Sequence, residues 1–247
     1  MSHHIVEVRN LCFAYPDGTE ALNNVSFRII HGEAVAVVGA NGAGKSTLLM
    51  HLNGCLIPRR GEVRIGETPL TPATTTGVRR VVGMVFQDPD DQLFMPTVFD
   101  DVAFGPLQAG LPPAEVEQRV IMALERVGMP HLKHRPPYRL SAGEKRAVTI
   151  ATVLAMEPAI LVMDEPSSNL DPRGRGRLIE LLGSFEHTRI IATHDLEMVV
   201  ELCGRVIVLD AGRVVADGPA LELLNDEQLM LAHGLERPHS LRHLHPH

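Results

Sequence analysis

The sequence predicts an α/β protein with a mostly parallel sheet as its core, an antiparallel β subdomain at the N-terminus and an inserted lobe of helices. Short apolar runs such as "AVAVV" and "ILVM" are typical of strands buried on both faces of a sheet. These runs alternate with helical segments, which is the order that a parallel sheet covered on both faces requires. From about residue 95 to residue 157 helical spacing replaces the alternation, which indicates the inserted lobe.

Length and repetition bear on the number of domains. The 247 residues are enough for one large core, and no internal repeat is visible. We therefore expect a single ATPase-sized domain over residues 1–235, with the helical lobe at about residues 95–157. A histidine-rich tail is expected over residues 236–247.

The first third of the chain is predicted to supply most of the strands. Its opening run "IVEVRNLCFAY" alternates apolar and polar residues as a half-exposed strand does, and the turn "PDG" follows it. Gly54 is expected to close the first helix. The elements predicted here are strands at residues 5–15, 24–30, 33–39, 61–67 and 79–86 and a helix at residues 45–54.

The remaining elements follow the same two periodicities. In the lobe, Val116, Val120, Leu124 and Val127 form one helical stripe, and Ser141 is a predicted N-cap for the next helix. The predicted helices are at residues 115–128, 141–157, 175–185 and 195–203, and the predicted strands are at residues 159–165, 188–194, 205–210 and 212–218.

Composition excludes several classes of protein. The chain has 23 Lys and Arg against 30 Asp and Glu, a net charge of −7, which disfavours general binding of nucleic acid. Its three cysteines are far apart, which argues against a disulfide framework or a zinc knuckle and favours a reducing cytoplasm. No apolar run approaches the roughly 18 residues of a membrane helix, and the start lacks the apolar core of a signal peptide. We therefore expect that other chains do any spanning of a membrane.

The stretch "GANGAGKST" carries the strongest chemical signal. It matches G-x-x-x-x-G-K-[ST] between a predicted buried strand and a predicted helix, the context in which this loop binds nucleotide phosphates. Glycines let successive amide groups face the phosphates, and the helix N-terminus adds positive charge. We expect Lys45 to reach the β- and γ-phosphates of ATP and Ser46 to supply a hydroxyl to Mg²⁺. The residues predicted to bind the nucleotide in this loop are Gly39, Asn41, Gly42, Ala43, Gly44, Lys45, Ser46 and Thr47.

Two carboxylates and a histidine are predicted at the carboxyl edge of the same sheet. Asp164 ends the strand "ILVMD" and is expected to contact Mg²⁺ directly or through water. Glu165 follows it and is expected to act as the general base for the attacking water. His194 closes another apolar strand, so the same edge aims it at the γ-phosphate.

These residues and four further motifs resemble the nucleotide-binding subunits of ABC transporters over nearly the full length. The resemblance implies a P-loop NTPase (RecA-like) core and an ATP-hydrolysing activity. It identifies Gln87 as the Q-loop glutamine that touches Mg²⁺ and takes part in catalysis, and Tyr15 as the ring that stacks on adenine. "LSAGE", residues 140–144, matches the family signature, and "SNLD", residues 168–171, matches the D-loop that ends in Asp171.

The signature departs from the family pattern LSGGQ at two positions. Ala142 and Glu144 replace Gly and Gln, whereas Ser141 and Gly143 remain. The resemblance implies a head-to-tail dimer, a homodimer by our expectation, in which each signature completes the ATP site of the partner subunit. We therefore expect Ser141, Ala142, Gly143, Glu144 and Asp171 to contribute to nucleotide binding.

Within the family the chain resembles the energy-coupling-factor group, and in that group the cobalt- and nickel-uptake ATPases most. "FQDPDDQLF", "FGPLQAGL", "LSAGEKR" and "PSSNLDPRGR" carry this resemblance. It implies a peripheral protein on the cytoplasmic face of the cell membrane, with a transmembrane coupling protein and a substrate-capture membrane protein as partners. Uptake of Co²⁺ or Ni²⁺ is the expected function, and an importer of a vitamin stays an alternative. A non-transport ATPase of DNA repair or translation is disfavoured, because the chain has no coiled coil and one ATPase domain.

Two acidic or histidine-rich segments suggest metal binding at first sight. "FQDPDDQLF" lacks the glycine and the terminal glutamate of a calcium loop, so we predict instead that it docks on the membrane partner. Asp88, Asp90, Asp91 and Gln92 are expected to face that partner, with Leu93 and Phe94 anchoring the segment in the lobe. The histidines at positions 233, 239, 243, 245 and 247 could bind Ni²⁺ or Co²⁺, or form a polar tail.

Overall fold

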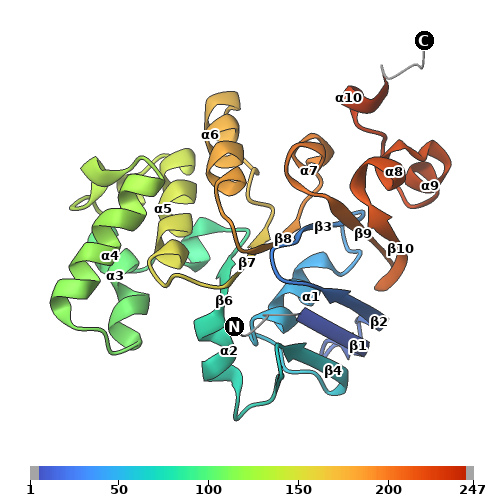
Figure 1. Cartoon of the computed structure of the whole chain (residues 1–247), viewed down its shortest axis with the longest axis horizontal. Coiled ribbons are helices and arrows are strands. Elements are labelled where there is room, and N and C mark those ends of the chain that lie inside the picture. The colour runs from blue at the N-terminus through green and yellow to red at the C-terminus, as the bar shows by residue number, and fades with distance from the viewer. Residues whose placement is uncertain (1–5, 243–247) are drawn as a thin grey trace.

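The computed structural model describes residues 6–242 and contains two sheets and a separate group of helices (Figure 1). The larger sheet has the strand order β10-β9-β3-β8-β7-β6, and the smaller one has the order β2-β1-β4-β5. Neighbours in the larger sheet are parallel except for the β9–β10 pair. The smaller sheet is antiparallel throughout. The predicted α/β class with an antiparallel β subdomain is therefore confirmed.

The predicted strands and helices are present, with bounds that differ by up to a few residues, whereas β5, α2, α3, α8, α9 and α10 are not among the predicted elements. The strands are β1 (Val6–Ala14), β2 (Glu20–Ile29), β3 (Ala34–Val38), β4 (Arg60–Ile65), β5 (Thr68–Pro69), β6 (Val82–Val85), β7 (Ile160–Asp164), β8 (Thr188–Ala192), β9 (Arg205–Asp210) and β10 (Arg213–Pro219). The helices are α1 (Lys45–Leu52), α2 (Thr75–Val81), α3 (Val98–Gln108), α4 (Pro113–Arg126), α5 (Ala142–Leu154), α6 (Pro172–Gly183), α7 (Leu196–Leu202), α8 (Ala220–Asn225), α9 (Glu227–Ala232) and α10 (His239–Arg242), with short 3₁₀ turns η1 (Pro89–Asp91), η2 (Pro130–Leu132) and η3 (Pro137–Arg139).

The parallel strands are buried on both faces, as their apolar sequences require. In β3, Val35 and Val37 pack with α1 and the smaller sheet, whereas Ala36 and Val38 pack on the side of α6, α7 and α8. This alternation is the period-two pattern of a strand. Because β3, β7 and β8 run in parallel, their carboxyl ends meet at one edge of the sheet. Gly39, Asp164 and Thr193, the residues that follow Val38, Met163 and Ala192, therefore lie at that edge.

The helical lobe consists of α3, α4 and α5, which Figure 1 shows beyond β6 and away from β1 and β2. Val116, Val120 and Leu124 of the predicted stripe are buried against this part of the core, and Val127 is partly buried there. The lobe helices run from Val98 to Leu154. Of these, α3 was not among the predicted helices.

The strand predicted at residues 79–86 is wrong in its first part. Residues 79–81 complete α2, and β6 contains only Val82–Val85. Arg79 donates to the Gly54 carbonyl at 2.9 Å, so the last turn of α2 is held against the loop that follows α1. A sequence window centred on the apolar run cannot detect this contact, because Gly54 lies 25 residues away.

The segment after β10 is helical, and part of the expected tail over residues 236–247 is included in it. It forms α8, α9 and α10, of which α10 begins at His239 inside the expected tail. The positions His243, His245 and His247 lie outside the described residues. Within residues 6–242, no group of three or more His, Cys, Asp or Glu is placed to hold a metal ion. In the same range no helix combines the length and the apolar character that crossing a membrane needs.

Candidate functional site

The phosphate loop connects β3 to α1 and folds closely against neighbouring backbone. A Cβ atom at Gly39 would collide with the Leu209 carbonyl, and one at Gly44 would collide with the Ala21 carbonyl. Gly44 also has φ +101, in the region that favours glycine. Both glycines are therefore required by the path of the loop, independently of any ligand.

The start of α1 has the features of an anion site. Gly44 is its N-cap and supplies no side-chain cap, so the amide groups of the first turn face the loop. The Lys45 ammonium is almost buried and donates to the carbonyls of Gly39 at 2.8 Å and Ala40 at 3.2 Å. A buried positive charge at a helix N-terminus is suited to the phosphates of a nucleotide.

Ser46 and Asp164 form the part of the site that fits a divalent cation. Burial raises the pKa of Asp164 at the end of β7, and hydrogen bonding from the Ser46 side chain opposes this shift. One oxygen of the Asp164 carboxylate, Oδ1, is buried and has no hydrogen-bond partner among the described residues. A hydroxyl and a free carboxylate oxygen are the hard ligands that Mg²⁺ prefers, so these residues fit the ion.

Glu165 is held in a specific conformation beside Asp164. Its side chain is 8% exposed, and its backbone has φ +47, which is uncommon for a residue other than glycine. Its amide donates to the Ala192 carbonyl at 2.8 Å, and its Oε2 accepts from the Thr193 hydroxyl at 3.2 Å. The turn after β7 therefore fixes the carboxylate against the end of β8.

His194 contacts the Glu165 carboxylate directly. The distance from His194 Nδ1 to Glu165 Oε2 is 2.7 Å, and the His194 amide lies 3.3 Å from the same oxygen. The imidazole itself is mostly exposed. The prediction that both residues share one edge of the sheet is confirmed, and the histidine can reach both the carboxylate and the solvent beside it.

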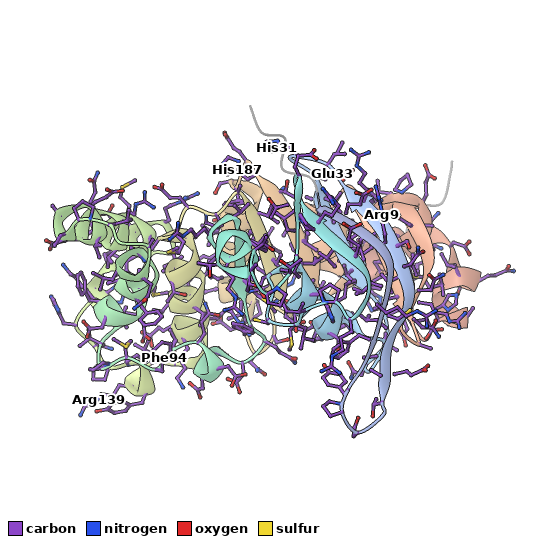
Figure 2. The ribbon with its side chains drawn as sticks, turned by 90° about the horizontal axis from the view of Figure 1, so that it is seen from below. Arg9, His31, Glu33, Phe94, Arg139 and His187 are labelled. Carbon is purple, nitrogen blue, oxygen red and sulfur yellow. The ribbon has the colours of Figure 1, made fainter. Side chains whose placement is uncertain are left out.

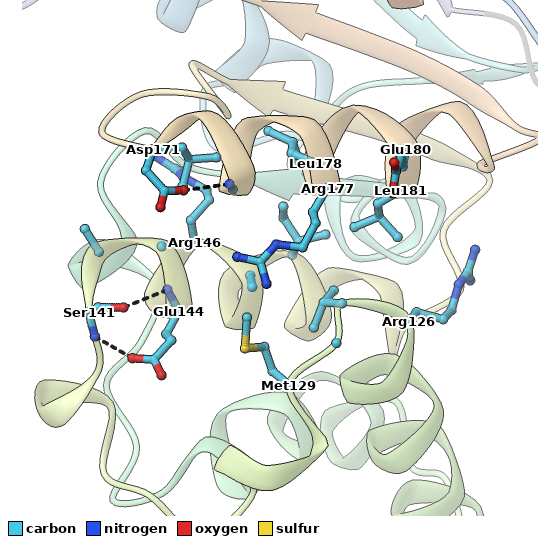
Figure 3. A pocket seen from close by; sticks show the side chains of 18 of the residues that line it. Arg126, Met129, Ser141, Glu144, Arg146, Asp171, Arg177, Leu178, Glu180 and Leu181 are labelled. Atoms are coloured by element: carbon cyan, nitrogen blue, oxygen red, sulfur yellow. Dashed lines mark hydrogen bonds between the residues drawn. The ribbon is translucent and has the colours of Figure 1, made fainter.

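The signature residues begin α5. The Ser141 hydroxyl accepts from the Glu144 amide at 3.3 Å, and the Glu144 carboxylate accepts from the Ser141 amide at 2.8 Å (Figure 3). This is a reciprocal capping box. The hydrogen bonds to Ser141 lower the pKa of Glu144. The glutamate that replaces the usual glutamine therefore has a structural role, which explains why the helix tolerates it.

The D-loop leads into α6, across a cavity from the signature. The Asp171 carboxylate caps α6 by accepting from the Gly174 amide at 2.6 Å, so the structure places it on its own helix. A cavity of about 620 Å³ lies between α6, α5 and the end of α4 (Figure 3). Its lining includes Ser141, Gly143 and Asp171. Arg177 extends from α6 into this space, toward Met129.

The Q-loop is fastened to α5 by Arg146, a residue that no sequence motif indicates. Arg146 donates to the carbonyls of Phe86 at 2.7 Å and Gln87 at 2.6 Å. Its side chain is 3% exposed, and burial lowers its pKa. Spacing on the predicted helix gives no sign of this contact, because an arginine two residues after the signature is equally suited to a solvated face.

The expected orientation of Gln92 is wrong, and so is that of Phe94. Gln92 turns inward: its Nε2 donates to the Thr152 hydroxyl at 2.7 Å, and its Oε1 accepts from the Phe86 amide at 3.2 Å. Phe94 is 62% exposed instead of anchoring the lobe, whereas Leu93 is buried as expected. The inward side chain of Gln92 forms hydrogen bonds with the Phe86 amide, the Thr149 carbonyl and the Thr152 hydroxyl, and these bonds explain the reversal.

The other predicted nucleotide residues lie around the loop. Tyr15 is partly buried, and its hydroxyl lies 2.9 Å from the Thr47 hydroxyl. Its ring packs edge-on against Phe13, with 5.0 Å between ring centroids. Asn41 is exposed at the tip of the loop, and the Ala43 amide donates to the Ala40 carbonyl at 3.1 Å. The structure thus brings Tyr15 to the first turn of α1, beside the predicted phosphate site.

A phosphate loop that opens a helix, together with an acidic pair at a strand end of the same sheet, defines a P-loop nucleotide hydrolase. Comparison with known proteins narrows this class. Residues 22–168 match the family described as ABC transporter. A putative ABC transporter ATP-binding protein of Geobacter sulfurreducens is 66% identical over 98% of this chain and 97% of its own length.

Two further similarities concern named transport systems. The energy-coupling factor transporter ATP-binding protein EcfA of Methanothermobacter thermautotrophicus is 47% identical, over 95% of this chain and 77% of its own length. The solved structure of cbiO1 from Clostridium perfringens, part of the ABC transporter complex cbiONQ, has a TM-score of 0.80 and 40% identity, and the match covers 93% of this chain and 94% of that one. The chain belongs to the ABC transporter family and is an ATP-hydrolysing transport ATPase.

Proposed function

We propose that the chain is the ATP-hydrolysing subunit of an energy-coupling-factor importer that takes up a transition metal ion, Co²⁺ or Ni²⁺, through partner membrane proteins. One observation carries the two-subunit mechanism of this ATPase. The signature helix α5 lies with the lobe, apart from the phosphate loop at α1 (Figure 1). A single chain thus holds two halves of an ATP site that do not meet, and a second copy is needed to join them.

A head-to-tail homodimer would join the two halves of the ATP site. In a symmetric pair, the signature of one subunit faces the phosphate loop of the other, and the same contact repeats at the second site. The cassette MJ0796, solved as a dimer, is 28% identical with a TM-score of 0.79 and supports this proposal. The dimer belongs on the cytoplasmic face of the cell membrane, bound to a transmembrane coupling protein and a substrate-capture protein.

The roles of the site residues follow from their chemistry. Lys45 binds the phosphates of ATP, and Ser46 and Asp164 hold Mg²⁺ with Gln87 as a further oxygen donor. Glu165 accepts the proton of the attacking water, and His194 stabilises the developing charge beside it. Mg²⁺, when bound, supplies charge neutralisation at the β- and γ-phosphates. The nucleotide contacts of Tyr15 and Asp171, and the division into residues 1–235 and a tail, belong to this proposal.

The choice of solute rests on similarity. The structural relative cbiO1 belongs to the complex named cbiONQ, and the chain carries the sequence features that favour cobalt or nickel uptake. An importer of a vitamin is the second candidate, because relatives named energy-coupling factor carry no solute in their names.

The solute is tested by uptake into vesicles that hold the chain with the membrane proteins that co-purify with it. We expect ATP-dependent accumulation of radioactive Co²⁺ or Ni²⁺, lost at least about tenfold when Lys45→Ala replaces the wild-type chain. Vesicles that accumulate a vitamin and neither metal would contradict the choice of solute while leaving the transport role intact.

An exposed aromatic pair marks the surface that docks on the coupling protein. Phe94 lies 5.2 Å from Phe104 of α3 between ring centroids, in an edge-on contact. The two side chains are 62% and 40% exposed. Figure 2 shows Phe94 on the lobe, at the edge opposite His31 and His187. Exposed aromatic side chains are preferred anchors of protein interfaces, and this pair continues directly from the Q-loop segment.

Replacing both rings is expected to weaken assembly. Phe94→Ser with Phe104→Ser should lower the amount of membrane partner that co-purifies by about tenfold, while ATP binding stays unchanged. Leu221→Ser is the matched control, because Leu221 is 59% exposed on α8, outside the lobe. If the same amount of membrane partner co-purifies with both variants, Phe94 and Phe104 are not part of the docking surface.

A further inference from the structure

The segment from Phe86 to Gln92 is fastened to the signature helix at both of its ends. At the first end, the Arg146 guanidinium binds the carbonyls of Phe86 and Gln87. At the other end, Gln92 donates to the Thr152 hydroxyl at 2.7 Å and to the Thr149 carbonyl at 3.1 Å. All these partners outside the segment lie on α5.

A third contact lies between these two ends. Lys145 forms an ion pair with Asp90 at 2.5 Å, and the Asp90 carboxylate is mostly exposed. An exposed pair of this kind contributes little to stability. The guanidinium of Arg146 is different, because it is itself buried and its charge is stabilised by the carbonyls of Phe86 and Gln87. Arg146 is thus the strongest of these ties.

The side chain of Gln87 is not held in the same way. It is exposed and makes no side-chain hydrogen bond within residues 6–242, whereas its carbonyl is bound by Arg146. The main chain of Gln87 therefore has its position set by α5, and its side chain is free to contact a ligand. Five residues before Arg146, Ser141 caps the N-terminus of the same helix.

The electrostatic surroundings of Arg146 connect it to the acidic pair. The charges of Asp88, Asp164 and Glu165 all act on the guanidinium and oppose the effect of its burial. Its Nε is buried and has no partner among the described residues. Arg146 thus lies between the signature, the Q-loop and the end of β7 without belonging to the predicted set of ligands.

We propose that Arg146 and Gln92 are positioning residues that fix the main chain of Gln87 to α5, so that Gln87 and the signature residues move as one unit. This inference rests on the proposed role of Gln87 at Mg²⁺. When the partner subunit's nucleotide draws the signature of α5 into place, the ties carry Gln87 with it. Neither Arg146 nor Gln92 is among the residues predicted to bind nucleotide or metal.

The test measures ATP hydrolysis by the purified full chain as a function of Mg²⁺ concentration. We expect Arg146→Gln to lower kcat about tenfold and to raise the Mg²⁺ concentration for half-maximal rate about fivefold. Binding of a fluorescent ATP analogue without Mg²⁺ should stay within about twofold of wild type. Arg146→Lys, which can reach one carbonyl, should fall between wild type and Arg146→Gln.

A double-mutant cycle separates positioning from a general loss of structure. Gln87→Ala removes the side chain that Arg146 positions, so Arg146→Gln should add less than about twofold to its effect. Arg119→Gln is the matched control, because Arg119 is also a partly buried lobe arginine but pairs with Glu115 and Glu157 within the lobe. This control should keep wild-type kcat and Mg²⁺ dependence.

The outcomes distinguish the inference from the function on which it rests. If Gln87→Ala hydrolyses ATP normally, the proposed role of Gln87 is wrong. If Gln87→Ala is impaired but the effects of the two substitutions multiply, the positioning role is wrong and the function stands. If Arg146→Gln does not fold, Gln92→Ala carries the same expectation, and wild-type behaviour of both Gln92→Ala and Arg146→Lys would overturn the inference.

Discussion

Glu165→Gln is expected to bind ATP with wild-type affinity and to hydrolyse it at least about 100-fold more slowly. The amide cannot accept the proton of the attacking water, whereas its shape is nearly that of the carboxylate. The oxygen that accepts from Thr193 and from the His194 amide can be kept, so the fold of this turn should survive. ATP should therefore remain trapped between two subunits.

Three measurements on one preparation check this expectation. They are the rate of phosphate release, the affinity for ATP, and the fraction of dimer in the presence of ATP. Glu222→Gln provides the control, since Glu222 is exposed on α8 and should behave as wild type. Phosphate release within about threefold of wild type would show that Glu165 is not the general base.

The place of Glu165 at the edge of the sheet could be predicted from the sequence. The buried apolar run of residues 160–163 is followed by two acidic residues. In a parallel sheet the end of such a strand lies at the carboxyl edge, so the sequence predicts both acidic side chains at that edge. The same reasoning placed His194, and the contact of 2.7 Å between the two side chains confirms that both reach one point. Strong periodicity and a fixed loop pattern made the phosphate loop equally clear.

Contacts between elements far apart in the chain could not be predicted in this way. Arg146 binds carbonyls about 60 residues away, and Gln92 binds Thr152 at the same separation. The pattern of a glutamine in an acidic surface segment favours exposure. The inward orientation of Gln92 is instead decided by its hydrogen bonds with Phe86, Thr149 and Thr152. Likewise, the last turn of α2 is set by Arg79 and Gly54 and not by local propensity.

The signature residues lie between these two cases. The sequence predicts Ser141 as an N-cap, and the structure confirms it. It does not show that Glu144 completes a capping box, although serine followed three residues later by glutamate is a known signal for one. The glutamate departs from the family pattern in the sequence, whereas in the structure the start of the helix is intact.

Gly143→Asp is expected to leave the fold and ATP binding by the isolated subunit unchanged and to lower hydrolysis at least about 100-fold. A Cβ atom at this helical glycine would meet only Leu170 Cδ2, at 3.8 Å, so there is room for a side chain. An aspartate in the first turn of a helix is also favourable for the helix itself. Its negative charge would instead oppose the γ-phosphate of the partner subunit's ATP.

Gly176→Asp on α6 is the matched control, because a Cβ atom there meets nothing within 4 Å. It should hydrolyse ATP like wild type. If both aspartates lower the rate equally, the effect comes from glycine replacement in a helix and not from the partner's nucleotide. If Gly143→Asp hydrolyses ATP at the wild-type rate, the signature does not contribute to the ATP site.

Mixing two inactive variants then decides between a site within one chain and a site shared by two. Lys45→Ala has an intact signature, and Gly143→Asp has an intact phosphate loop. In a head-to-tail dimer of one of each, the phosphate loop of one chain faces the signature of the other, so one of the two sites is complete. Random pairing in an equal mixture should restore about a quarter of the wild-type rate if the sites act independently. A mixture no more active than either variant alone would contradict the head-to-tail arrangement.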